Sequence, residues 1–283
     1  MSLYLLADKI KSTIILSLIL SLTACSSHRF LYYVPTPNIP VLEKKGESKL
    51  SAEGSLGSQG KATIYGLAFK TAYAISNHWA IGYSYNYMSD HTIYYRSNGG
   101  LFKPVEYNYY DSSNVHTSRS TQEFMLGYYT PVNKTKTIFF STYAGYSIGQ
   151  FSMNESGFSS DTNKYERHQN GSINTFFIQP GFYINPIPNI SLALVGKISA
   201  FNYQFADNNY TTNEKDYFKM NVNSNDYLVT FEPTAMISLG VKNFHLIGTA
   251  TLSSFVSRKK VDALTNCISA GLTVDVVNLL KNK

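Results

Sequence analysis

Asp90 and His91 are the residues best suited to catalysis, because a carboxylate beside an imidazole can take up and release protons near neutral pH. The other histidines are scattered, and no two have the close spacing typical of a metal site. The chain also lacks a glycine-rich phosphate-binding loop and the HExxH and CxxC motifs. The sequence therefore predicts no enzymatic activity, no metal and no cofactor, and an enzyme using Asp90 and His91 is the alternative.

A second group of reactive side chains lies at alternate positions of segments that read as β-strands. They share the parity of small and polar residues and are Lys49, Glu53, Lys70, Glu123, Lys197, Glu232 and Asp275. A charge that faces lipid at mid-depth costs about 2–4 kcal/mol, so these side chains should face the inside of a barrel and pair there. We expect Lys197 and Glu232 to approach each other. Such a network would fill a narrow lumen rather than line a wide channel.

The elements that position these charges are ten predicted strands with period-two alternation. In the clearest of them Trp79, Ile81, Tyr83, Tyr85 and Tyr87 fall on one face, opposite small or polar residues. Most of the segments reach the 9–11 residues or so that a tilted membrane-spanning strand needs. Their predicted limits are 48–56, 61–75, 79–95, 117–130, 137–153, 172–185, 190–206, 226–240, 244–256 and 266–277.

The links between these segments alternate between short turns and, for the most part, longer polar stretches, as in transmembrane barrels. The fold class is therefore all-β, an antiparallel up-and-down transmembrane β-barrel with ten strands, or eight as the alternative. Tyr83, Tyr85 and Tyr87 should form an external aromatic girdle, with Trp79, Phe140 and Phe244 near the periplasmic turns. A soluble β-sandwich or lipocalin-like barrel, with the aromatic residues inside, is the competing interpretation.

Composition supports a folded β-protein. The 283 residues are 14% aromatic and only 15% charged, with a net charge of +6. A disordered chain or a coiled coil would carry more charge and fewer aromatic residues, and two cysteines are too few for a disulfide scaffold. Lys and Arg form no cluster beyond Arg258-Lys259-Lys260, so the basic balance does not indicate nucleic acid.

The N-terminus reads as a targeting segment. Residues 1–24 have the basic start and short apolar run of a secretory signal peptide. Leu22-Thr23-Ala24-Cys25 resembles the bacterial lipobox, and this resemblance implies that Cys25 becomes lipidated. Residues 25–47 then form an N-terminal tether, which Pro35, Pro37 and Pro40 keep extended. We assign no redox role to Cys267.

The chain as a whole resembles Bacteroidota-type outer-membrane β-barrel lipoproteins, an uncharacterised family of small closed barrels. The resemblance rests on the lipobox, on Pro40–Glu47 and on the strand–turn–strand segment Ala72–Ile81, with a weaker match to a barrel-insertion signal at Ser269–Val276. It implies a barrel at residues 48–277, a C-terminal tail at 278–283 and an outer-membrane location. No acidic run follows Cys25, and this favours a lipid anchor in the periplasmic leaflet.

The longer links suggest binding more than catalysis, because tyrosine among serine and asparagine makes adaptable contact surfaces. The candidate residues are Tyr94, Tyr95, Tyr107, Tyr109, Tyr110, Tyr210 and Tyr217. We therefore expect a structural, adhesive or accessory component of an envelope complex, in contact with outer-membrane lipid and other envelope proteins. The alternatives are a lipid-modifying or protease-like enzyme at the external rim and a narrow pore or hydrophobic-solute transporter.

Overall fold

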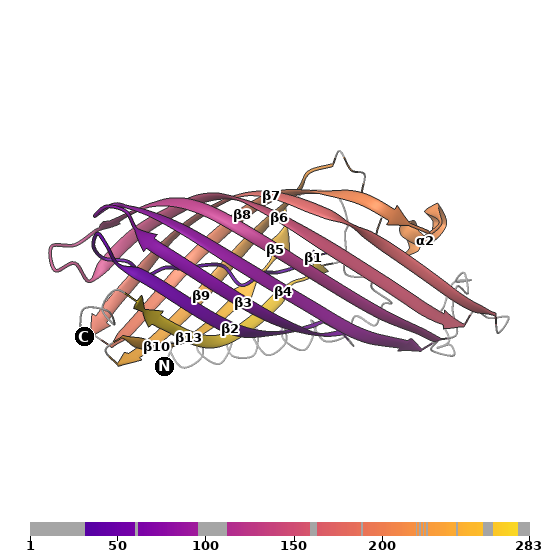
Figure 1. Cartoon of the computed structure of the whole chain (residues 1–283), viewed down its shortest axis with the longest axis horizontal. Coiled ribbons are helices and arrows are strands. Elements are labelled where there is room, and N and C mark those ends of the chain that lie inside the picture. The colour runs from indigo at the N-terminus through magenta and orange to yellow at the C-terminus, as the bar shows by residue number, and fades with distance from the viewer. Residues whose placement is uncertain are drawn as a thin grey trace, which may run out of the picture.

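The protein is a closed antiparallel β-barrel (Figure 1). The computed structural model describes residues 32–59, 62–95, 112–158, 163–187, 189–218, 220, 222, 224, 226–241, 243–256 and 263–276. Each wall strand pairs with the next along the chain, and the last pairs with the first. The ten wall strands are β2 (Ser48–Gln59), β3 (Ala62–Ala74), β4 (Trp79–Tyr95), β5 (Ser112–Pro131), β6 (Ile138–Phe158), β7 (Lys164–Ile187), β8 (Ile190–Asn208), β9 (Leu228–Val241), β10 (Phe244–Leu252) and β13 (Asn266–Asp275). The prediction of a ten-stranded up-and-down barrel is confirmed, and the eight-stranded alternative is wrong.

Three short strands and one helix complete the described structure. The strands are β1 (Tyr32–Tyr33), β11 (Ser254–Phe255) and β12 (Ala263–Leu264), and the helix is α2 (Thr212–Tyr217). β11 pairs with β9 beyond the end of β10, and β1 pairs in parallel with β12. No helix among these residues is long and apolar enough to cross a membrane.

The two ends of the barrel differ in their links. Links 75–78, 132–137, 188–189 and 242–243 gather at one end, which we call the short-turn end. The opposite end, on the right in Figure 1, carries α2 and is called the long-link end. Strands β4 to β8 have 17 to 24 residues, whereas β2, β3, β9, β10 and β13 have 9 to 14. The first group forms a tall wall and the second a low wall, so the tall wall projects past the low wall at the long-link end.

The outward face is apolar near the short turns. On β3, Tyr65, Leu67 and Phe69 each expose more than half of their surface, whereas Ala68 and Lys70 between them are buried. Successive residues of a strand point to opposite faces, so the predicted parity is correct. A soluble barrel would place these residues the other way round, and this alternation contradicts the soluble interpretation.

This alternation reverses along the tall wall. On β7, outward Phe176 and Ile178 are exposed, but the outward residues nearer the long-link end are polar, including Lys164 and Glu166. The inward residues there become apolar instead, and Val115, Phe151, Met153, Ile173, Phe201 and Tyr203 join one buried cluster. Here the strands pack as in a soluble barrel. Because the predicted limits followed outward apolar residues, they stopped β7 at 172 and β6 at 153, short of the observed strand ends.

The reversal predicts a matched pair of substitutions. Leu67→Arg puts a charge in the outward apolar band and should cost about 2–4 kcal/mol if the site lies near the bilayer midplane. Gln204→Arg lies outward on β8 beyond the band, and a surface substitution of this kind should stay within about 0.5 kcal/mol. Denaturant unfolding from lipid vesicles measures both, and equal costs would contradict the assigned band.

Candidate functional site

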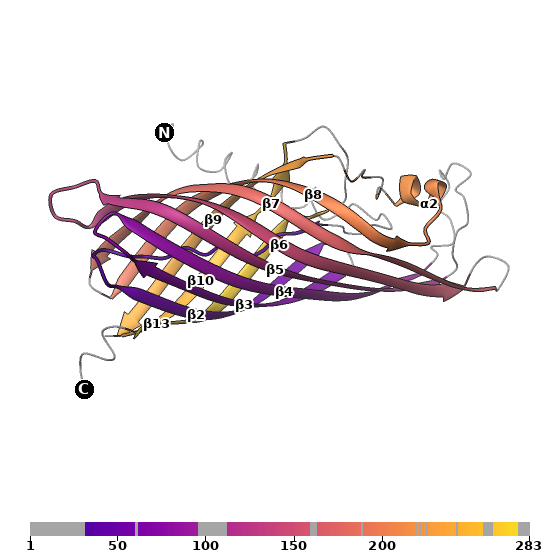
Figure 2. The same cartoon turned by 45° about the horizontal axis from the view of Figure 1, so that its top comes forward.

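The lumen is occupied by the chain's own N-terminal part. Residues 32–47, which we call the luminal segment, run lengthwise between the walls, as the indigo trace in Figure 2 shows. Tyr32, Tyr33, Val34 and Leu42 are each at most 3% exposed. The prolines correctly predict an extended segment here. The expected place is wrong, because residues 32–47 lie inside the barrel and not in a tether before it.

Side chains of the wall bind the backbone of the luminal segment. Lys70 of β3 donates to the carbonyl of Pro37 at 2.9 Å, and Gln179 of β7 donates to the carbonyl of Asn38 at 2.8 Å. The Tyr183 hydroxyl donates to the carbonyl of Leu42. A buried carbonyl without a partner is costly, so these contacts allow an extended chain to lie inside a barrel.

Small inward residues make room for the segment. Leu42 is fully buried in a cluster with Ala72, Ala74 and Ala80 on one side. Tyr143 and Phe177 of the tall wall close the cluster on the other side. The small inward residues of β3 and β4 therefore have a packing role, because they accommodate the luminal segment.

Three ion pairs join the predicted luminal charges. Lys70 and Glu53 are 2.5 Å apart, Lys197 and Glu123 are 2.7 Å apart, and Lys49 and Asp275 are 2.5 Å apart. The first two pairs are almost fully buried, and the third lies near the short-turn end. All of these residues face inward, as predicted.

Lys197 and Glu232 approach each other, as expected, but the ion-pair partner of Lys197 is Glu123. The two residues are opposite each other on β8 and β9, but the Lys197 ammonium reaches Glu123 on β5. Glu232 instead accepts hydrogen bonds from Tyr32 of the luminal segment and from Thr230. Pairing charges between neighbouring strands does not predict this arrangement, because it leaves Tyr32 outside the barrel in the expected tether.

Two residues that the sequence does not predict for this site, Arg119 and Phe201, lie around Tyr32 and Tyr33. Arg119 of β5 donates to the carbonyl of Tyr33 at 3.5 Å, and its guanidinium lies 5.0 Å from the centre of the Tyr32 ring. Tyr32 also stacks on Phe201 at 4.7 Å. Two signals were available: Arg119 shares the inward parity of Glu123, and Tyr32-Tyr33-Val34 is too apolar for a solvated tether.

The link between β8 and β9 caps the long-link end. Tyr210 donates to Glu155 at 2.7 Å, and Arg167 pairs with Glu155 at 3.6 Å and also with Glu214 of α2. Thr211 and Glu214 form a capping box that starts the helix. Phe218, Met220 and Val222 enter the same buried cluster as Tyr32.

This cap contains two of the predicted binding tyrosines, and burial corrects one of them, Tyr210. Tyr210 is buried, and Tyr217 packs edge-on against Phe218 and lines the same cluster. Both therefore help to fold the cap. The side chains of Tyr94 and Tyr95, at the end of β4, and the whole of Tyr107, Tyr109 and Tyr110 lie outside the described residues, as does Cys25.

Arg167→Met is expected to loosen the cap, because it leaves Glu155 and Glu214 without their cation at a partly buried site. The expected result is faster proteolysis within residues 209–227 while the barrel keeps its gel mobility. Lys164→Met is the matched control, since Lys164 pairs with Glu166 on the solvated surface. Equal proteolysis of the two variants would contradict the role given to Arg167.

The structure separates the proposed catalytic pair. Asp90 points into the lumen, where it accepts a hydrogen bond from Tyr33 at 3.0 Å, whereas His91 points outward and is exposed. Neighbouring residues of one strand face opposite sides, so the two cannot act on one substrate atom. The chain also holds one Gly-x-Ser-x-Gly string at 145–149, but it lies inside β6 rather than at the strand-to-helix turn that a nucleophile elbow needs.

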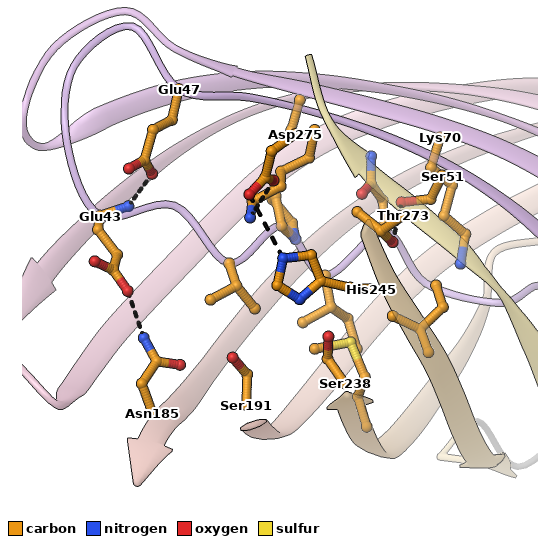
Figure 3. Close-up of a pocket in the computed structure, with 18 of the residues that line it drawn as sticks. Glu43, Glu47, Ser51, Lys70, Asn185, Ser191, Ser238, His245, Thr273 and Asp275 are labelled. Atoms are coloured by element: carbon orange, nitrogen blue, oxygen red, sulfur yellow. Dashed lines mark hydrogen bonds and ion pairs between the residues drawn. The ribbon is translucent and has the colours of Figure 1, made fainter. Parts of the chain in front are cut away.

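A cavity of about 460 Å³ lies beside the luminal segment at the short-turn end (Figure 3). The low wall contributes hydroxyls from Ser51, Ser238 and Thr273 together with His245, whose ring lies 3.5 Å from Asp275. At the mouth, partial desolvation and the nearby Glu47 raise the pKa of Glu43. The volume suits a small ligand, but its strongest charges already pair with one another.

The part of the chain that is described contains no group of three or more His, Cys, Asp or Glu side chains close enough to hold a metal ion. No family model and no curated protein match the sequence.

Solved structures of several outer-membrane barrels are similar in outline. An outer membrane channel from Pseudomonas putida F1 has 8% identity and a TM-score of 0.39, and the match covers 84% of this chain and 99% of that one. The translocator domain of the autotransporter NalP from Neisseria meningitidis has 11% identity and a TM-score of 0.42, over 81% and 88%. The outer membrane protease OmpT from Escherichia coli has 10% identity and a TM-score of 0.39, over 81% and 94%. These likenesses assign no activity to this chain.

Proposed function

We propose that this protein is an outer-membrane β-barrel closed by its own luminal segment, acting as a structural, adhesive or accessory component of the cell envelope and not as an enzyme. The observation that carries the proposal is the luminal segment itself. It is buried along the barrel, and its backbone is bound by side chains from both β3 and β7. A barrel that serves as an open channel would keep this space for water or solute.

The outward apolar band supports a membrane location, since soluble proteins rarely expose such a surface. Short turns at one end and longer links at the other are typical of outer-membrane barrels, with the short turns in the periplasm. The lipobox at Leu22–Cys25 supports a Bacteroidota-type lipoprotein with Cys25 acylated after signal-peptide removal. Lipid is therefore the first partner of this chain, and no feature favours nucleic acid.

The tall wall supports the role at the surface. Beyond the apolar band its outward face is polar and its inside is packed with apolar side chains, so it forms a packed projection capped by α2, Phe218, Met220 and Val222. A polar projection of this kind is better suited to contact with other envelope proteins than to the passage of a solute. The separation of Asp90 and His91 disfavours the enzyme alternative.

The test uses the intact protein purified in detergent. Unboiled samples should migrate differently from boiled ones on a gel, as folded membrane barrels do, and the folded protein should give no conductance steps in a planar lipid bilayer. The absence of a mobility shift would overturn the barrel in the membrane. Steady conductance by the intact chain would instead favour the narrow pore. The cavity beside the luminal segment is the observation that supports this alternative.

A further inference from the structure

The luminal segment runs through the barrel in one direction. At the short-turn end Gly46 donates to the carbonyl of Ala74 at 2.8 Å, which fixes this end of the segment beside the start of β2. Asn38 donates to the carbonyl of Thr71 at 3.1 Å, and Pro37 is bound by Lys70. As the residue numbers of the segment fall, its contacts on β3 move away from the short turns.

The same progression continues to the far end of the described segment. Thr36 bonds Asn86, which is opposite Ala68, and Tyr33 bonds Asp90, which is opposite Ile64. From the level of Ala74 to that of Ile64 the segment climbs ten positions of β3, about 33 Å at the usual rise of a strand. The contacts show no reversal along this path.

At Tyr32 the segment has reached the rim of the low wall. Tyr32 and Tyr33 pair with Ala263 and Leu264, which precede the start of β13 at the long-link end. Glu232, the partner of Tyr32, lies four positions after the start of β9, which is at the long-link end. The chain before Tyr32 therefore starts from the long-link end of the lumen.

We propose that the residues before Tyr32 leave the barrel at the long-link end, so that Cys25 is held at the outer face of the membrane and the barrel displays its own N-terminus. The seven steps from Cys25 to Tyr32 span at most about 25 Å, so a return to the short-turn end would need a second, fully extended chain beside the luminal segment, where the inward side chains are already buried. The absence of an acidic run after Cys25 favours a lipid anchor in the periplasmic leaflet. The direction of the luminal segment instead supports an anchor in the outer leaflet of the membrane. This inference rests on the proposed membrane orientation.

The experiment labels single introduced cysteines on intact cells with a membrane-impermeant maleimide. Ser27→Cys tests the N-terminus, Ser160→Cys marks a long link, and Lys134→Cys marks a short turn. The unsubstituted chain gives the background, because Cys267 is buried and the proposed lipidation blocks the thiol of Cys25. We expect Ser27→Cys and Ser160→Cys to label on intact cells and Lys134→Cys to label only after lysis.

The controls separate the two possible failures. If Ser160→Cys labels on intact cells but Ser27→Cys labels only after lysis, or in neither case, the display of the N-terminus is wrong and the proposed function stands. If Lys134→Cys labels on intact cells and Ser160→Cys does not, the orientation behind the proposed function fails as well. A protease site inserted after Ser27 gives a second readout and should be cleaved on intact cells.

Discussion

Deleting residues 32–42 is expected to turn a silent barrel into a conducting one. The deletion removes Tyr32, Tyr33 and Leu42 from the lumen and frees Lys70, Gln179 and Glu232 from the contacts that hold them on the segment. Water can then enter a passage lined by charged and polar side chains. In planar bilayers the variant should give discrete conductance steps, whereas the intact chain should give none.

One further variant keeps this expectation testable if the deletion folds poorly, and another extends it if the deletion folds well. Replacing residues 32–42 with a glycine–serine stretch of equal length keeps the connection to β2 and should also conduct, with frequent interruptions by the loose chain. Combining the deletion with Arg167→Met should raise the conductance further, because the cap at the long-link end also blocks the lumen. Folded variants that stay silent would show that the wall side chains alone close the barrel.

Lys197→Met is expected to destabilise the barrel by about 3–5 kcal/mol, the usual cost of removing one partner of a buried ion pair. Lys197 is 1% exposed, 2.7 Å from Glu123 and 4.3 Å from the centre of the Phe177 ring. Methionine preserves the apolar stem but leaves the Glu123 carboxylate buried without its cation. Denaturant unfolding from vesicles, followed by gel mobility, measures the loss.

The double variant Lys197→Met/Glu123→Met separates charge from packing. Replacing a whole buried pair with apolar residues is often close to neutral, so it should recover most of the lost stability. Lys164→Met, which removes a partner of the solvated pair with Glu166, should change little. A double variant as unstable as Lys197→Met would mean that packing, not the unpaired carboxylate, causes the loss.

Period-two alternation was enough to predict the wall, because a barrel in lipid constrains every second side chain. The start of β4 at Trp79 and of β10 at Phe244 agrees with the sequence. Alternation of apolar and polar residues no longer marks the strand where the wall leaves the lipid. Beyond the apolar band the outward face of β7 is polar, so the predicted strand begins at residue 172 and the observed one at Lys164.

The luminal charges were identifiable from parity, but their partners were not. Parity places Lys197 and Glu123 in the same lumen without showing that they meet across it. The sequence predicts the extended form of the luminal segment but not its place, since a proline-rich extended chain has the same sequence signature inside a barrel as outside. Only the aromatic pair Tyr32-Tyr33 indicated a buried destination.

The connection of the luminal segment to β2 has a consequence for the order of assembly. The ring closes between its first and last strands, where β2 meets β13 from Lys49 opposite Asp275 to Leu56 opposite Ile268. With the acyl groups proposed for Cys25, the chain end could not be drawn through the finished ring, so we expect the ring to form around a segment already in place. We then expect the seam between β2 and β13 to close last in folding, with the Lys49–Asp275 ion pair stabilising it at the short-turn end.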